Sequence, residues 1–275
     1  MSVKTSHNSL PYSLQKAAYQ CLMLSDAQEK IEQTIKVRAK WCANDIVIDP
    51  SFIAKNNCDV GLPKKPKLVP FNQLPKRTLT SELGHAALIH SFAHIEYNAI
   101  NIAWDAVQRF NSMPDEYYND WSQVAAEEAY HFRLLRDYLI SLGFDYGSFD
   151  AHAGLWEMVE ETAHDVLVRM ALVPRVLEAR GLDVTPDIIK RFRKHKLNKA
   201  ADILDIIYQD EIGHVAIGTR WFKYTCEQRR LNSDETFASL INQYAIDKIR
   251  KPFNVDAREQ AGFSETEMAY LSALK

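Results

Sequence analysis

Apolar residues recur at helical spacing along most of the chain, and this pattern predicts long helices. In the clearest case the apolar stripe consists of Ile89, Phe92, Ala93, Ile100, Ala103 and Val107. The four segments with the strongest pattern lie at about 81–111, 115–142, 155–180 and 199–228. Four long helices in sequence, with a short link inside each pair, favour a four-helix bundle.

The chain on either side of these segments carries weaker signals. Residues 12–43 are predicted to be helical, and Ser25-Asp26 is the N-terminal signal for a helix from Ala27 to Cys42. Half of the prolines lie between Pro50 and Pro75, which predicts an extended surface connector because Pro interrupts helices. Later helices are expected from Thr185-Pro186 to about 195, near 234–249 and near 264–273.

These elements predict an all-α chain of three parts packed as one structural unit. The parts are residues 1–79 (N-terminal helices and Pro-rich connector), 80–230 (four-helix bundle) and 231–275 (C-terminal helical extension). Gly143 and Gly181 are expected to end helices. Pro174 is expected to kink the third helix of the bundle.

Carboxylates and imidazoles interrupt the four apolar stripes in the order Glu, Glu-x-x-His, Glu, Glu-x-x-His. The residues are Glu96, Glu128, His131, Glu178, Glu211 and His214. The first two Glu are 32 residues apart and the last two 33, so antiparallel helix pairs place them at similar levels. Burying several carboxylates together is costly unless a cation neutralises them. The set matches that of dinuclear iron and manganese carboxylate bundles, so we expect two divalent metal ions here.

Neighbouring residues are candidates to support such a site. Asp210 could accept the free N–H of metal-bound His131. Glu127 could act in the same way, although a solvated surface position is favoured slightly for it. Tyr208 and Trp121 are read as core aromatics, with a redox role as the alternative. Gly213 and Gly218 lie inside a helix beside the ligands, where the expected reason is room for a neighbouring helix or for a substrate.

Two other interpretations of these residues compete with the metal site. A buried salt-bridge network is disfavoured because Arg175 is the one basic residue on these stripes. Two further Glu-x-x-His pairs, Glu82/His85 and Glu161/His164, lie too far along their helices to join the same site. A second metal site built from them is not favoured.

The motifs resemble the ferritin-like superfamily over about residues 80–228, and more closely the DUF455 family of bacterial ferritin-like proteins. The resemblance rests on segments 92–100, 126–131 and 207–214, together with Lys251-Pro252-Phe253-Asn254. It implies a dinuclear metal site, usually of iron, with manganese as the alternative. It does not imply a substrate, because a fold does not fix a function.

Composition narrows the remaining classes. Nine Gly in 275 residues indicate few turns and argue against an all-β fold. A net charge of −3 gives no indication of nucleic-acid binding. The four cysteines include no Cys-x-x-Cys pair, which argues against a thiolate zinc site and a disulfide framework. The chain shows no signal peptide and no apolar run of membrane-spanning length, so a cytoplasmic location is expected.

Together these features favour an oxygen-dependent oxidoreductase or hydroxylase acting on an organic substrate. Such an enzyme needs an external electron donor, and we expect a monomer or a small homo-oligomer. Two alternatives stay open. One is a non-catalytic binding or scaffold protein whose metal only stabilises the bundle. The other is metal storage or detoxification, which requires a closed cage of many subunits.

Overall fold

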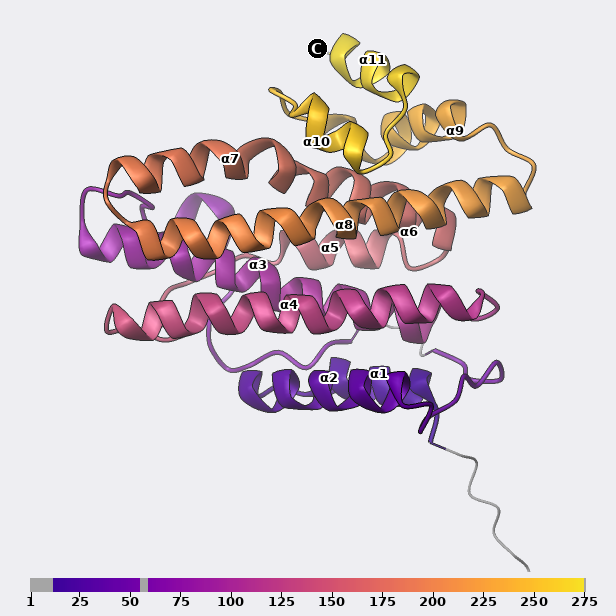
Figure 1. Ribbon diagram of the computed structural model, residues 1–275, viewed down its shortest axis with the longest axis horizontal. Coiled ribbons are helices and arrows are strands. Elements are labelled where there is room, and N and C mark those ends of the chain that lie inside the picture. Colours follow the sequence, from indigo (N-terminus) through magenta and orange to yellow (C-terminus); the bar gives the residue numbers. More distant parts are fainter. Residues whose placement is uncertain (1–11, 55–58, 275) are drawn as a thin grey trace, which may run out of the picture.

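The protein is a layered stack of helices, as the computed structural model shows for residues 12–54 and 59–274 (Figure 1). The bundle helices α3, α4 and α8 run side by side with a composite fourth helix, while α1 and α2 lie on one side and α9 to α11 on the other. Within the described ranges no strand is present, which confirms the all-α prediction. The element bounds are α1 Leu14–Met23, α2 Ala27–Cys42, η1 Phe71–Gln73, α3 Glu82–Arg109, α4 Asp115–Ser141, α5 Gly154–Glu161, α6 Val166–Leu172, η2 Val173–Glu178, α7 Ala179–Lys194, α8 Asn198–Gln228, α9 Ser233–Leu240, η3 Ile241–Ala245, η4 Ile246–Lys248, α10 Val255–Gln260 and α11 Glu265–Ala273.

The N-terminal helices pack against the first bundle pair, α1 on α3 and α2 on α4. Asp26 caps α2 as predicted, because its side chain accepts a hydrogen bond of 2.9 Å from the Glu29 amide. The Pro-rich connector between α2 and α3 contains only the short helix η1 in its described part. It pairs with the loop after α4, where the Val69 amide donates to the Ala151 carbonyl at 2.8 Å.

Helices α3 and α4 form an antiparallel hairpin whose ends follow the sequence signals. The Ser81 hydroxyl accepts a hydrogen bond of 3.1 Å from the Gly84 amide at the start of α3. Helix α4 begins after Pro114 and carries Asp115 and Glu116 in its first turn, where negative charges interact favourably with the helix dipole. Gly143 follows the end of α4 with φ +85°, a backbone conformation that Gly adopts without strain.

The third bundle helix differs from the prediction at both ends. The expected segment 155–180 is divided, because α5 ends at Glu161 and a new helical run starts at Val166. Asp165 causes the restart: its side chain accepts a hydrogen bond of 2.8 Å from the Leu167 amide. The run then continues through η2 and α7 to Lys194. Its length therefore matches that of its neighbours, although it is displaced along the sequence.

The predicted helix end at Gly181 and the predicted helix start at Thr185-Pro186 are both wrong. Pro186 lies inside α7, where its missing N–H leaves the carbonyl of Leu182 without its helical donor. The side-chain amide of Asn254 supplies a replacement, donating to Leu182 O at 3.2 Å. The C-terminal extension thus replaces the hydrogen bond that Pro186 removes, and the helix continues past the proline.

Pro174 distorts the helix beside the candidate site, as predicted. The turn Val173–Glu178, labelled η2, is a π-helix, a form that occurs mostly as single turns and often at functional sites. Gly218 of α8 provides the space, because a Cβ there would overlap the Pro174 ring. Of the two readings for Gly218, the structure favours room for a neighbouring helix. At Gly213, by contrast, a Cβ would meet no atom within 4 Å.

A buried ion pair fastens the bundle at the far end of α3. The Asp105 carboxylate accepts hydrogen bonds from Arg169 of α6 at 2.7 Å and from Arg109 at 2.7 Å. Asp105 and Arg169 are both fully buried. Removing one partner of such a pair would leave the other charge uncompensated in the core.

The C-terminal extension covers α7 and α8. The helical run Ser233–Lys248 formed by α9, η3 and η4 corresponds to the predicted helix near 234–249, and α11 to the one near 264–273. Helix α10, which Asn254 caps, was not predicted. No described helix is both long enough and apolar enough to cross a membrane. Cys21, Cys42 and Cys226 are free thiols, while Cys58 and the N-terminal residues read for a signal peptide lie outside the described residues.

Candidate metal centre

The middle of the bundle gathers the six acidic and imidazole side chains singled out in the sequence. Helix α3 supplies one, α4 and α8 supply a Glu-x-x-His pair each, and η2 supplies one at its last residue. Glu96, Glu128, His131 and His214 are buried, and Glu178 and Glu211 are partly buried. The spacing of three residues places the Glu and His of one helix on the same face.

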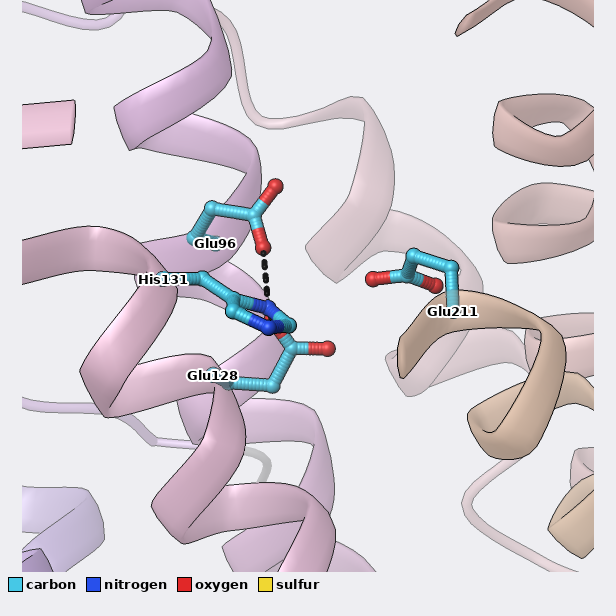
Figure 2. A group of neighbouring side chains, drawn as sticks. All are labelled: Glu96, Glu128, His131 and Glu211. Carbon is cyan, nitrogen blue, oxygen red and sulfur yellow. Dashed lines mark ion pairs between the residues drawn. The ribbon is translucent and has the colours of Figure 1, made fainter. Parts of the chain in front are cut away.

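Four of these side chains form a tight cluster. One ligand atom from each of Glu96, Glu128, His131 and Glu211 lies within 4.8 Å of the others. Figure 2 shows Glu96, Glu128 and His131 on one side and Glu211 facing them from α8. The Nδ1 atom of His131 lies 3.3 Å from Glu96 Oε2 and 3.5 Å from Glu128 Oε2. This arrangement leaves a space surrounded by potential metal ligands.

Glu128 lies between the two histidines. Its Oε2 faces His131, and its Oε1 lies 3.0 Å from Nδ1 of His214. His214 Nδ1 is also 3.5 Å from Glu211 Oε1. Glu128 therefore directs one carboxylate oxygen toward each imidazole.

Glu178 stands at the edge of the cluster and is not one of the four residues brought within 4.8 Å of one another. Its buried Oε2 atom has no hydrogen-bond partner. The neighbouring charges of Glu211 and Glu128 act on it. Of the six predicted ligands, it is the one whose placement depends on the π-turn.

The carboxylates that precede the two ligand pairs act across helices. Asp210 of α8 accepts a hydrogen bond of 2.9 Å from Nε2 of His131 on α4. Glu127 of α4 accepts one of 2.9 Å from Nε2 of His214 on α8. The preference for a solvated Glu127 is therefore wrong, because α4 turns this side chain toward α8. Each carboxylate fixes its partner's Nε2 as a donor, so that Nδ1 is the atom available to a metal.

Burial and mutual repulsion shape the protonation of the cluster. Burial, then the charges of Glu211 and Glu128, raise the pKa of Glu178 to about 8. Burial and the Glu128 charge likewise raise the pKa of Glu96 and of Glu211. Burial opposes ionisation of Glu128 too, but contacts with His131 and His214 outweigh it and hold its pKa below its usual range.

The same carboxylates favour protonation of the two imidazoles. Burial would lower the pKa of His131, but Glu128 and Glu96 raise it to about 11. Without a metal, protons therefore supply the positive charge that the carboxylates need. A divalent cation would take the place of these protons, as metal binding to His and carboxylate ligands does in general.

Several of the candidate ligand atoms lack hydrogen bonds. Half of the buried side-chain polar atoms without a hydrogen bond in the described structure belong to this cluster. They are Glu96 Oε2, Glu128 Oε1, Glu128 Oε2, His131 Nδ1, Glu178 Oε2 and His214 Nδ1. Buried polar groups are normally satisfied, and an exception points to a missing ion or water. The donor set and its unsatisfied atoms fit a divalent metal.

Other candidates from the sequence lie elsewhere. The Tyr208 hydroxyl accepts a hydrogen bond of 3.0 Å from Asn254, and Trp121 is buried in the core. Glu82 lies in the first turn of α3 as expected. Glu161 pairs with Lys248 at 3.2 Å. Within residues 12–54 and 59–274, neither of the two extra Glu-x-x-His pairs belongs to a group of metal-ligating side chains.

A cavity of about 270 Å³ opens beside the cluster. Its walls come from α3, η2, α7 and α8, and residues 150–152 after α4 close it together with the connector. Glu96, Glu178 and Glu211 line it, and so does Arg77 of the connector. Arg77 was not identified from the sequence, because a single Arg in a Pro-rich stretch carries no periodic signal.

Comparison with known proteins places the chain in a family. The family described as "Protein of unknown function (DUF455)" matches residues 23–269. A protein of Haemophilus influenzae described as "Uncharacterized protein" is 45% identical over 229 residues, covering 81% of this chain and 79% of its own. No solved structure matches the chain.

Proposed function

The chain belongs to the DUF455 family, and we propose that it is a dinuclear metal carboxylate protein that oxidises an organic substrate with O₂. The observation that carries the proposal is the set of six buried ligand atoms without hydrogen bonds. The ferritin-like pattern of ligands supports the same reading. Mixed carboxylate and imidazole ligation suits iron or manganese, and we favour iron.

The roles of the residues follow from their positions. Glu96 and His131, with one oxygen of Glu128, would hold one ion. Glu211 and His214, with the other oxygen of Glu128, would hold the second. Asp210 and Glu127 orient the two imidazoles. Bound iron would supply the capacity to reduce O₂.

Glu178 is the carboxylate most free to move a proton in this arrangement. It lines the cavity, and its burial raises its pKa to about 8. It also lies outside the group of four side chains whose ligand atoms are within 4.8 Å of one another. A carboxyl group whose pKa lies near neutral pH can exchange protons with groups in the cavity.

The cavity favours catalysis over a purely structural metal. A stabilising site needs no space beside it, yet about 270 Å³ adjoins three of the carboxylates. This volume is near the lower end of pockets that hold small organic molecules, about 300–1000 Å³. A storage role would not call for such a cavity within one chain.

Metal analysis followed by reaction with O₂ tests the proposal. Protein produced with added iron should contain about two iron atoms per chain, and His131→Ala should reduce that content strongly. The reduced protein should then consume O₂ when the two are mixed in a stopped-flow instrument. A metal-loaded wild type that consumes no O₂ would favour the scaffold alternative, and a cage of many subunits in light scattering would favour storage.

A further inference from the structure

The cavity beside the cluster has two chemically different linings, and this difference indicates a ligand. We propose that it binds an organic carboxylic acid, with the apolar body along the helices and the carboxylate on Arg77. This inference rests on the proposed function, since the same cavity would bring the substrate to the metal centre. It adds the chemical class of that substrate.

The walls of the cavity are apolar over most of their length. Four elements contribute aliphatic side chains, and the main ones are Ile95, Ala99, Leu177, Val184, Leu204 and Ile207. A ligand gains binding free energy in proportion to the apolar surface that it removes from water. A polar body would gain nothing from such walls, so the part of the ligand that fills them is hydrocarbon.

Arg77 contributes a charge that the protein leaves uncompensated. It lines the cavity, and no acidic side chain forms an ion pair with it in the described part of the chain. Asp150 lines the same cavity but makes no such pair. The guanidinium presents two parallel N–H donors that match a carboxylate.

Arg180, the other arginine of the cavity, is already engaged. Its Nη1 donates to the carbonyls of Arg250 at 2.9 Å and Pro252 at 3.1 Å. It also lies 3.5 Å from Asp183. These bonds hold the C-terminal extension against α7, so Arg180 serves the fold, and Arg77 is left for a ligand.

The histidines near Arg77 do not compete for the ligand charge. Nδ1 of His94 is hydrogen-bonded to Tyr146 at 2.8 Å, and its Nε2 lies 3.1 Å from the carbonyl of His152. Burial lowers the pKa of His94 to about 4, so it is neutral at pH 7. Burial also lowers the pKa of His152. Among the described side chains of this wall, Arg77 is therefore the cation left to meet a ligand with a single negative charge.

Gly181 provides a way to close the cavity without disturbing the core. It lines the cavity from α7, and a Cβ at this position would meet no atom within 4 Å. Gly213 of α8 has the same freedom but does not line the cavity. A leucine at the first position would occupy ligand space, whereas the same change at the second would not.

Calorimetric titration of the metal-loaded full chain with octanoate and with octanol tests the inference. We expect wild type to bind both. Arg77→Gln should weaken octanoate binding at least tenfold and leave octanol binding unchanged. Gly181→Leu should abolish both, while Gly213→Leu should bind both as wild type does.

Three outcomes would overturn the inference. They are no octanoate binding to the metal-loaded wild type, equal octanoate binding in Arg77→Gln, and undiminished binding in Gly181→Leu. The metal content of each sample is measured in parallel. A wild type that holds metal but does not bind octanoate refutes the pocket alone. A wild type that binds octanoate but never holds metal refutes the proposed function alone.

Discussion

The two carboxylates outside the cluster are the residues whose effect can be isolated most cleanly. Asp210 lies on α8 yet contacts His131 of α4, and Glu127 lies on α4 yet contacts His214 of α8. Each therefore orients a ligand on the opposite helix. The histidine of each Glu-x-x-His motif is therefore oriented by the residue that precedes the other motif.

Replacing Asp210 by Asn should weaken metal binding by about 10–100-fold, because it removes the carboxylate that accepts the proton of the His131 Nε2 atom. Competition with a chromophoric chelator measures the affinity. The matched control is Asp205→Asn on the same helix, since the side chain of Asp205 is about half exposed and forms its ion pair with Arg193. Equal metal affinities for the two variants would contradict this role.

A second residue, Asp105, links stability to pH. Burial opposes its charge, but Arg169 and Arg109 outweigh burial and lower its pKa. A carboxyl whose pKa is depressed on folding contributes stability that is present above its unfolded value, about 3.9. That contribution is lost as the pH falls through the lower folded pKa.

Asp105→Asn should therefore destabilise the protein by about 3–5 kcal/mol at pH 7, because it leaves Arg169 buried without its partner. The difference in unfolding free energy from wild type should be constant above about pH 5 and should shrink below about pH 4. Urea denaturation over this range checks both. A difference that does not vary with pH would show that the charge of Asp105 is not responsible.

At the scale of elements, the contact between η2 and α8 positions the site. Pro174 packs directly on Gly218, and Glu178 closes the same turn. The shape of this turn decides how far the carboxylate of Glu178 reaches. Local packing between two helices thus sets the position of a candidate ligand.

Gly218→Ala should destabilise the protein by about 1–3 kcal/mol, since the added methyl group overlaps Pro174. Gly213→Ala is the matched control. It should stabilise by about 0.5–1 kcal/mol because Ala favours the helix and meets no atom there. Thermal unfolding of the two variants measures the contrast. If both changes had the same sign, the packing explanation would fail.

The elements also show what the sequence could and could not predict. The ends of α2, α3 and α4 follow local capping signals, so they were predicted closely. The boundaries of α6 and α7 were not predicted closely. Asp165 restarts a helix, and Asn254 satisfies the carbonyl exposed by Pro186 from 72 residues away. A contact of that range leaves no trace in local periodicity.

The same distinction holds for the whole molecule. The six candidate ligands carry a helical signal because they interrupt apolar stripes, and their pattern was evident in the sequence. Arg77 carries none, because its place in the cavity depends on the connector that pairs with the loop after α4. Regular elements were therefore predictable, and the parts that close the cavity over them were not.

The central claim is that this bundle holds two metal ions between its four helices. Anomalous diffraction from crystals of the metal-loaded protein, recorded at the iron and manganese edges, tests it most directly. We expect two peaks, one on either side of Glu128, the first beside Glu96 and His131 and the second beside Glu211 and His214. Crystals of protein saturated with iron and manganese that show no peak among these side chains would contradict it.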